Sequence, residues 1–404
     1  MKRRELLKLA AVTGGVSLAP SWVWAASGPP AGTDRVIAIF LRGGADGLDL
    51  VPPLGEHRYS DLRPTLAISE SDALPLDPFF GLHPAAGGLK ALFDSGDLAV
   101  VHASGLATPQ RSHFSAQAAM EQGIDAGDLP PGDGWLGRYL REIGVTDPLA
   151  AIALDTAVPK SMSGLNQVLA VGAIDAFDVA VDGGSRSALL AAYAADPILD
   201  PTARAVFDAA DGLAPAAAMP PGPGYPEGPV GTALADAARL IKTGVGLRAA
   251  AVNAGGWDHH DDQLAQMAPL LAALGEALAA FREDLGSDWD STVVVVQTEF
   301  GRRVAENASG GTDHGHGGVT LVAGGGVLGG RVVSDWPGLG PAELTDGQDL
   351  AVTIDYRQVL ADLLTARLGI DEPTAILGGW RPGPPLGLFA GTPGSAAAHR
   401  LAVG

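Results

Sequence analysis

Two patterns of apolar and polar residues alternate along this chain. Short continuous runs of β-branched and other apolar residues are typical of strands that a sheet buries on both faces. Such runs occur at 35–41, 98–102, 149–154, 247–253, 293–296 and 319–322. Between them lie longer segments, several with apolar residues three and four positions apart, which predict helices. These segments are 85–93, 114–121, 134–143, 234–242, 262–285 and 355–368.

This alternation of strands and helices predicts an α/β fold, with a mostly parallel sheet and helices on both of its faces. The segment 197–231 departs from the pattern, because it is rich in Ala, Pro and Gly. We interpret it as an insertion, so residues 33–404 are expected to form a single domain. Asp355 is the expected N-cap of the last helix, with Gln358 three residues on as in a capping box.

The N-terminal residues 1–26 have the composition of an export signal. Basic residues at 2–4 precede an apolar stretch at 9–18, and Val23 and Ala25 offer small side chains for cleavage. Arg3-Arg4 with Leu6-Leu7-Lys8 resembles a twin-arginine signal, which exports folded proteins, and an ordinary secretory signal is the alternative. We expect a periplasmic or secreted protein that uses the twin-arginine machinery. The apolar stretch is too short for a membrane span, so no stable membrane insertion is expected.

The amino-acid composition limits which partners the protein can bind and which side chains can be metal ligands. The 404 residues include 46 acidic and 26 basic side chains, giving a formal net charge of −20. This charge argues against binding nucleic acid or an anionic membrane, both of which require a basic surface. An anionic substrate would need local cations to attract it. The chain has no cysteine, so thiolate metal sites, disulfides and cysteine nucleophiles are excluded and metal ligands must be His, Asp or Glu.

Polar residues gather beside the predicted strands, where α/β sheets bind ligands. Five of the nine histidines lie in three short clusters. The residues that follow a predicted strand are Asp46, Arg111-Ser112-His113, Asp258-His259-His260 and Glu299, and those that precede one are Asp313, His314 and His316. We therefore expect one site at the carboxyl edge of the sheet.

Asp258 and His260 are the first candidate metal ligands. A carboxylate beside an imidazole suits zinc or manganese, and the glycines before them allow a tight turn. His259 would point away from His260 in extended backbone. The alternative is a helix start, with Asp261 or Asp262 as N-cap and the histidines solvated.

Further candidate ligands come from the neighbouring segments. His314 and His316 stand among glycines, which suits a metal loop better than a packed core, and only one of them need be a ligand; a flexible polar loop is the alternative. Glu299 ends a buried strand, where a carboxylate requires a cation or Arg302 close by. The same reasoning applies to Asp46, although Asp-Gly is also a turn signal.

Ser112 is the candidate nucleophile. It stands at the start of the predicted helix 114–121, where the helix dipole stabilises an alkoxide and an attached anion, and a metal would activate it further. Arg111 would clamp an anionic ester oxygen, and His113 would be a ligand or a hydrogen-bonding partner of the substrate. The alternative for Ser112 is a plain N-cap.

Taken together, these motifs resemble the bacterial family catalogued as domain of unknown function 1501, placed with the alkaline phosphatase and sulfatase-like superfamily. The resemblance covers nearly all of the mature chain. The stretches that carry it are Gly43-Gly44-Ala45-Asp46-Gly47, Arg111-Ser112-His113-Phe114, Gly256-Trp257-Asp258 with His260, Glu299-Phe300-Gly301-Arg302 and Thr312-Asp313-His314-Gly315.

The resemblance implies an alkaline-phosphatase-like fold and roles for particular residues. Asp46 would bind metal after the first strand, Ser112 or its neighbour Thr108 would be the nucleophile, and one ion would be held by Asp258, His260 and either His314 or His316. The second ion of that superfamily uses an Asp-His pair, which corresponds here to Glu299-Phe300. Because phenylalanine binds no metal, a second site would be absent or all-oxygen, suited to calcium or magnesium.

The sequence therefore favours an exported metal-dependent hydrolase or transferase acting on a small-molecule or glycan phosphate or sulfate ester. The alternative is a catalytically inactive metal-binding or envelope interaction protein that keeps the fold. A structural protein without an ion is a third reading.

Overall fold

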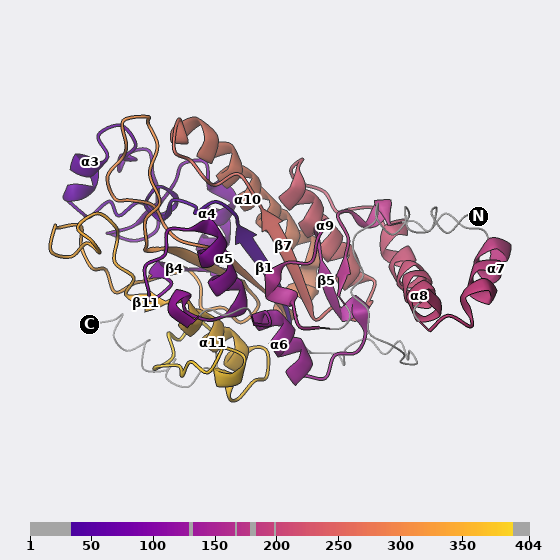
Figure 1. The fold of residues 1–404 in the computed structure, drawn as a ribbon. Helices are drawn as coiled ribbons and strands as arrows, with labels where there is room; N and C mark the ends of the chain where they lie inside the picture. The colour runs from indigo at the N-terminus through magenta and orange to yellow at the C-terminus, as the bar shows by residue number, and fades with distance from the viewer. Residues whose placement is uncertain (1–33, 129–131, 166–167, 178–182, 198, 391–404) are drawn as a thin grey trace.

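The computed structural model describes residues 34–128, 132–165, 168–177, 183–197 and 199–390. The expected export signal at 1–26 lies outside these residues. The described chain forms one mixed sheet with helices on both faces (Figure 1). Its strands are β1 (Arg35–Leu41), β4 (Leu98–Gly105), β5 (Ala151–Ala153), β6 (Leu169–Ala170), β7 (Ala249–Ala254), β8 (Thr292–Thr298), β9 (Gly318–Gly324), β10 (Arg331–Val333) and β11 (Ile354–Asp355).

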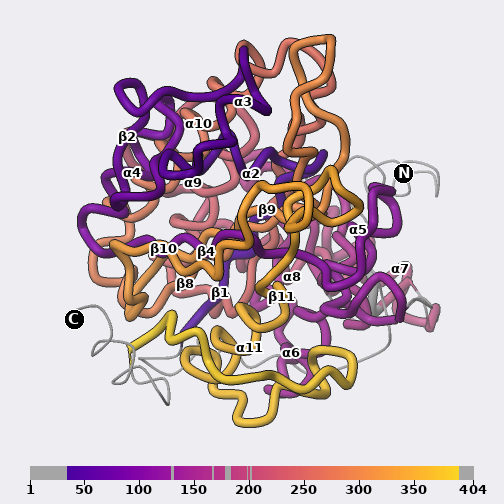
Figure 2. Tube along the Cα trace, turned by 90° about the vertical axis from the view of Figure 1, so that its left-hand side faces the viewer, coloured from indigo at the N-terminus to yellow at the C-terminus, as the bar shows by residue number. Residues whose placement is uncertain are grey.

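The strand order is β10-β4-β9-β8-β1-β7-β5-β6, with β11 also paired to β4. Strands β1, β7 and β8 are parallel and form the centre, with Val36 level with Ala249 on one side and Val293 on the other. The predicted mostly parallel α/β sheet is confirmed. The exception is β9, which runs antiparallel to both β4 and β8. Figure 2 shows β4, β8, β9 and β10 close to one another.

The direction of β9 matters for the site. Because β9 runs against its neighbours, its first residues lie at the edge where β8 and β1 end. Residues just before β9 are thereby brought beside residues just after the parallel strands. A short separate hairpin, β2 (Leu74–Pro75) and β3 (Gly81–Leu82), lies outside the main sheet.

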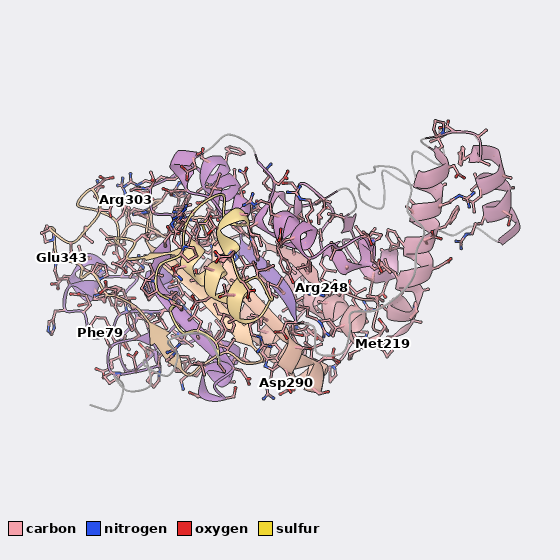
Figure 3. The ribbon with its side chains drawn as sticks, turned by 90° about the horizontal axis from the view of Figure 1, so that it is seen from below. Phe79, Met219, Arg248, Asp290, Arg303 and Glu343 are labelled. Carbon is pink, nitrogen blue, oxygen red and sulfur yellow. The ribbon has the colours of Figure 1, made fainter. Side chains whose placement is uncertain are left out.

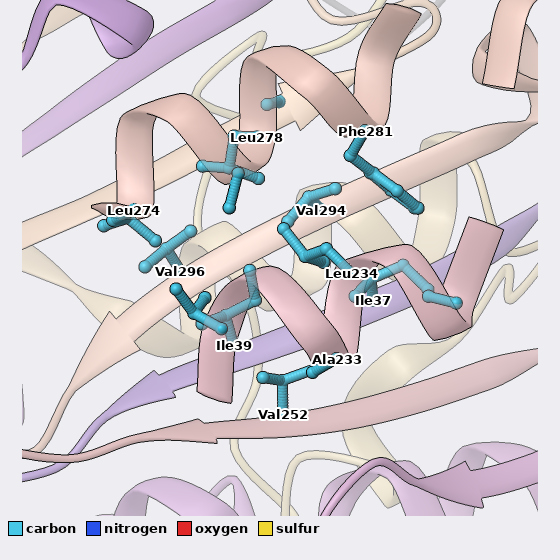
Figure 4. Close-up of a cluster of buried hydrophobic side chains, with 14 of the residues drawn as sticks. Ile37, Ile39, Ala233, Leu234, Val252, Leu274, Leu278, Phe281, Val294 and Val296 are labelled. Carbon is cyan, nitrogen blue, oxygen red and sulfur yellow. The ribbon is translucent and has the colours of Figure 1, made fainter. Parts of the chain in front are cut away.

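Helices cover both faces, and the alternation of side chains along each strand divides the core between them. Ile37 and Val294 point to the side of α4, α9 and α10, where they join Leu234 and Leu274 (Figure 4). Val36 and Val295 point to the side of α5, α6 and α11. The helices on the sheet are α4 (Gly87–Asp94), α5 (His113–Gln122), α6 (Trp135–Glu142), α9 (Pro229–Lys242), α10 (Gln263–Leu285) and α11 (Tyr356–Ala366).

The N-termini of α11 and α10 can be compared with the predicted caps. Asp355 caps α11 as expected, accepting from the backbone N–H of Arg357 at 2.9 Å. The predicted capping box is wrong, because the Gln358 amide donates to Asp362 and its oxygen accepts from Gly383 N. Asp262 lies at the N-cap of α10 with φ of 44°, and its side chain makes no capping hydrogen bond.

Helix α10 is long and apolar enough to cross a membrane by length and composition alone. In this fold it packs against α4 and α9, and Leu271, Leu278 and Phe281 are buried in the core. Burying each such side chain contributes roughly 1.5–3 kcal/mol, which accounts for the apolar composition of a core helix.

The segment interpreted as an insertion contains a helix that the sequence pattern did not predict. Helix α8 (Leu199–Ala218) packs against α7 (Gly183–Tyr193) and α9. In Figure 1 and Figure 3, α7 and α8 extend to one side of the sheet and its covering helices. Two short helices, α2 (Gly47–Leu50) and α3 (Arg58–Leu62), follow β1.

Candidate metal centre

Four loops meet at the carboxyl edge of the central strands. They follow β1, β7 and β8, and the fourth leads into the antiparallel strand β9. Gly43 shows how closely they approach, because a Cβ on it would lie 2.5 Å from the backbone nitrogen of Asp258. Gly43 also has φ of 126°, a conformation that favours glycine. The glycines after β1 therefore allow the β1 and β7 loops to touch.

Arg302, in the loop after β8, hydrogen-bonds to the other three loops. Its side chain is 1% exposed and its Nε donates to the carbonyl of Gly44 at 2.6 Å. Nη1 donates to the carbonyl of Thr312 at 2.9 Å, and Nη2 donates to the carbonyl of Gly43 and to Asp258 Oδ1, the latter at 2.6 Å. A buried guanidinium requires such acceptors, so its burial fixes the positions of the loops.

Three imidazoles converge on Asp258. His260 Nε2 and His314 Nε2 each lie 3.1 Å from Asp258 Oδ1 and 3.0 Å from one another. His113 Nε2 lies 3.3 Å from Asp258 Oδ2. Ligand atoms of His113, Asp258 and His314 all lie within 4.8 Å of one another. A tetrahedral ion with bonds of about 2 Å has ligands about 3.3 Å apart, close to these separations.

The other ring nitrogen of each histidine is held by an oxygen. His314 Nδ1 donates to the backbone carbonyl of Arg111 at 2.8 Å. His113 Nδ1 lies 2.9 Å from Glu299 Oε1. This oxygen also accepts from Gly43 N and Gln117 Nε2, so the ring must be the donor. His260 Nδ1 lies 3.4 Å from Asp313 Oδ1. When a ring carries its proton on Nδ1 alone, its Nε2 is left free on the side of Asp258, as in histidines that bind metals.

Asp258 supplies negative charge to the same point. Partial burial raises its pKa, but the hydrogen bond and charge of Arg302 and the contacts of His314 and His260 outweigh this and lower the pKa to about 2. The carboxylate is therefore ionised at neutral pH. Imidazole lone pairs and a carboxylate at these distances repel one another unless a proton or a metal cation lies between them. The donor set of His113, Asp258 and His314, with His260 beside it, thus fits one divalent ion such as zinc or manganese.

Glu299 and Phe300 leave little for a second ion. Glu299 is fully buried; its Oε1 accepts three hydrogen bonds, and Oε2 lies 3.2 Å from the Thr298 hydroxyl. Phe300 packs against the rings of His113 and His314, with centroids 5.1 and 4.7 Å away. The place where the resemblance implied a second ion is therefore filled by a hydrogen-bonded carboxylate and an aromatic ring.

Asp46 forms a buried ion pair. Arg63 donates to its two oxygens at 2.6 and 3.1 Å, and the side chains are 0% and 1% exposed. Gln263 Nε2 and the backbone N–H of Leu48 donate to it as well. Burial raises the pKa of Asp46, but the charge and hydrogen bonds of Arg63 outweigh it and hold the pKa below its usual value. Its oxygens are thus occupied by protein donors.

The remaining two histidines of the sequence clusters do not face Asp258. His316 is buried, and its Nε2 donates to the carbonyl of Leu106 at 2.7 Å. Burial lowers the pKa of His316, so the ring is neutral near pH 7. His259 is 2% exposed and packs beside Trp257. His259 is thus buried, whereas the ring of the next residue, His260, contacts Asp258.

Ser112 directly precedes His113 at the N-cap of α5, and its side chain is exposed and makes no capping hydrogen bond. The Thr108 hydroxyl donates to Asp125 at 2.6 Å. Arg111 faces Asp346 and Asp349, both of which accept from its guanidinium. Its expected role as an anion clamp therefore competes with two carboxylates.

Sequence reasoning missed two parts of this arrangement. A cation or Arg302 was expected beside Glu299, and Arg302 instead joins Asp258 to the loop carbonyls. Gln117 received no role, although its side chain links Arg42 to Glu299. A glutamine four residues after His113 lies on the same face of the helix, and that spacing is the signal that would have found it.

Comparisons with known proteins place the chain in a family. Residues 97–376, more than half of the sequence, match the model of a protein of unknown function, DUF1501. The chain belongs to this family. The matched range includes His113, Asp258, His260, Glu299 and His314, and the resemblance expected from the sequence is confirmed. No curated protein matches the chain.

Two solved structures are similar in outline. Ps i-CgsB in complex with k-i-k-neocarrahexaose is 10% identical with a TM-score of 0.40, covering 86% of this chain and 73% of its own. The soluble domain of lipooligosaccharide phosphoethanolamine transferase A from Neisseria meningitidis is 11% identical with a TM-score of 0.33, covering 76% and 86%. At these scores neither likeness assigns a function to this DUF1501 protein.

Proposed function

We propose that this DUF1501 protein is an exported, metal-dependent hydrolase or transferase that acts on a phosphate or sulfate ester. The observation that supports it most is the convergence of three imidazole Nε2 atoms and one ionised carboxylate at the carboxyl edge of the sheet. Each imidazole also has an oxygen partner on its far side, which orients a ring for metal binding.

The proposed ligands are Asp258, His113, His260 and His314, which suit zinc or manganese. A divalent ion bound there would polarise an ester oxygen and lower the pKa of a nearby hydroxyl. The neighbouring protein groups would position it: Glu299 orients His113, and Arg302 holds Asp258 in place. The residues present favour one ion, so the second, harder ion drops out of the proposal.

Ser112 remains the proposed nucleophile. It adjoins the ligand His113, its side chain is exposed, and it stands at the N-terminus of a ten-residue helix, where the dipole favours an anion. Thr108 is the weaker alternative, because its hydroxyl donates to Asp125. Arg111 is better placed to anchor His314 through its carbonyl than to hold an ester oxygen.

The test combines metal content with turnover of aryl phosphates and aryl sulfates. We expect about one equivalent of zinc or manganese, and turnover that a chelator abolishes and the ion restores. His314→Ala should lose both metal and activity, whereas Ser112→Ala should lose activity alone. His57→Ala is the matched control, because His57 is exposed and lies before α3, outside the cluster. Metal retained by His314→Ala would refute the ligand assignment.

A second candidate is a binding protein that keeps the ion without turnover. The observation in its favour is Phe300, whose 3% exposed ring packs on two of the proposed ligands where a second ion would otherwise bind. Stoichiometric metal together with no turnover of either ester class would support this candidate and exclude the enzyme.

A further inference from the structure

A row of polar side chains lies along the edge of the sheet, next to the proposed metal ligands His113, Asp258, His260 and His314. Strands β5, β7, β1 and β8 are neighbours in that order, and the residues that follow or end them are Asp155, Asn253, Arg42 and Glu299. Asn253 Nδ2 donates to Asp155 Oδ2 at 2.6 Å, and Arg42 Nε donates to Asn253 Oδ1 at 2.9 Å. Gln117 accepts from Arg42 Nη1 at 3.0 Å and donates to Glu299 at 2.9 Å. One network thus joins Asp155 to the ligand His113.

The charge of this row indicates what it would bind. Arg42, 21% exposed, pairs with Glu121 at 2.9 Å and is flanked by the amides of Asn253 and Gln117. The row has an acidic residue at each end, Asp155 and Glu299, and with Glu121 it holds three carboxylates against the single guanidinium of Arg42, so a second anionic group is disfavoured. Carboxylate, amide and guanidinium groups side by side match a ligand that both donates and accepts hydrogen bonds.

A small cavity adjoins the row. It has a volume of about 20 Å³, enough for one water or one hydroxyl-sized group. Asn253 and Glu121 border it, together with the aromatic rings of Phe40 and Trp135. Gln297 also lines it, and the amide nitrogen of this 5% exposed residue has no hydrogen-bond partner within the part of the chain that the structure describes. A buried donor without a partner indicates that an acceptor belongs in the cavity.

We infer that the row and its cavity bind a neutral polyhydroxylated group, a sugar ring, as the alcohol part of the ester substrate. Hydroxyls would bond to Asp155, Asn253 and Arg42, and one oxygen would enter the cavity and accept from Gln297. This inference rests on the proposed function, because it places the sugar beside the metal cluster where the ester would react. The row would determine specificity and would touch no reacting atom.

The test measures sugar binding separately from catalysis. Full-length protein is titrated with neutral hexoses, pentoses and N-acetylhexosamines and with their oligomers up to hexamers, by saturation-transfer NMR and calorimetry. We expect at least one to bind and Asp155→Ala to weaken its binding at least tenfold. Gln297→Leu should do the same without unfolding the protein, because it removes a donor that has no partner. Asp94→Ala is the control, since Asp94 is exposed and pairs only with Lys90 among the described residues.

The two proposals can fail separately. Sugar binding should persist in His314→Ala, which tests the metal and not the row. If no sugar binds while chelator-sensitive ester turnover is intact, the sugar inference is refuted and the proposed function stands. If a sugar binds but neither ester turns over, the row is supported and the enzyme is not. Equal binding by Asp155→Ala, Gln297→Leu and Asp94→Ala would place the sugar elsewhere and refute the inference.

Discussion

Asp258 and Asp46 both lie just beyond a central parallel strand and both bond to an arginine, yet the structure treats them differently. Asp46 is 1% exposed and Arg63 binds both of its oxygens. Asp258 is 45% exposed, gives one oxygen to Arg302 and faces three imidazoles. The comparison shows that position at the sheet edge alone does not leave a carboxylate free to bind a metal: the oxygens of Asp46 are occupied by protein donors, whereas Asp258 is half-exposed and faces imidazoles.

Replacing each carboxylate in turn tests most directly whether Asp46 is structural and Asp258 is not. Asp46→Ala leaves the Arg63 guanidinium charged, fully buried and without its partner, which should lower the free energy of unfolding by about 3–5 kcal/mol. Asp258→Ala should cost less in metal-free protein, because Asp258 is 45% exposed, so water can take its place beside Arg302, and because Arg302 keeps four backbone carbonyls where Arg63 keeps two. Urea unfolding of both variants in chelator measures the difference. Equal losses would show that Asp258 is a structural residue too.

Asp49 gives the next largest effect. Burial and the neighbouring Asp46 raise its pKa from 3.8 to about 7. Between these values the native protein binds more protons than the unfolded chain, so its free energy of unfolding should fall as pH rises from about 4 to 7. Asp49→Asn should remove that loss and be more stable by roughly 2–4 kcal/mol at pH 8. Unfolding curves from pH 4 to 8 test this, and a constant difference between the proteins would contradict it.

The sequence predicted the elements better than their directions. Continuous apolar runs identified β1 and β8 because a buried strand needs such residues along its whole length. Nothing in the run at β9 indicates that it is antiparallel, because strand direction depends on long-range pairing. That direction brings His314, which precedes its strand, to the edge where β7 ends and Asp258 follows. Helix α8 escaped prediction because the prolines and glycines of its segment indicated irregular structure, although its alanines favour a helix.

For the site, residue type and position predicted the cluster but not the partners. Asp258, His260 and either His314 or His316 were expected together, and His314 is the one that lies beside Asp258 and His260. Glu299, Asp46 and His316 have the same chemistry, but whether an oxygen or a ring nitrogen is already occupied depends on distant residues such as Arg63 and Gln117. His113 was left open between ligand and substrate contact, and its ring orientation follows from Glu299, which lies 186 positions away.

The same comparison applies to Glu299 and Asp313, the carboxylates beside the Nδ1 atoms of His113 and His260. Glu299→Gln should weaken zinc affinity about 10- to 100-fold, because the neutral amide orients His113 less strongly than the buried carboxylate does. Competition with a chromogenic chelator measures this. Glu276→Gln, at an exposed position of α10, should leave the affinity unchanged. The same affinity in all three proteins would mean that His113 binds no ion.

Asp313→Asn should give the smallest effect on zinc affinity. It is compared with Glu299→Gln because Asp313 is exposed and Glu299 is buried. Asp313 Oδ1 lies 3.4 Å from His260 Nδ1, and the two side chains are 47% and 44% exposed. A solvated contact of this length contributes about 0.2–1 kcal/mol, because water screens the charges and replaces the lost hydrogen bond. Asp313→Asn should therefore reduce zinc affinity no more than a few-fold in the same chelator competition. A loss as large as that of Glu299→Gln would show that His260 depends on a carboxylate partner as strongly as His113 does, and that burial of the partner is not what makes the support effective.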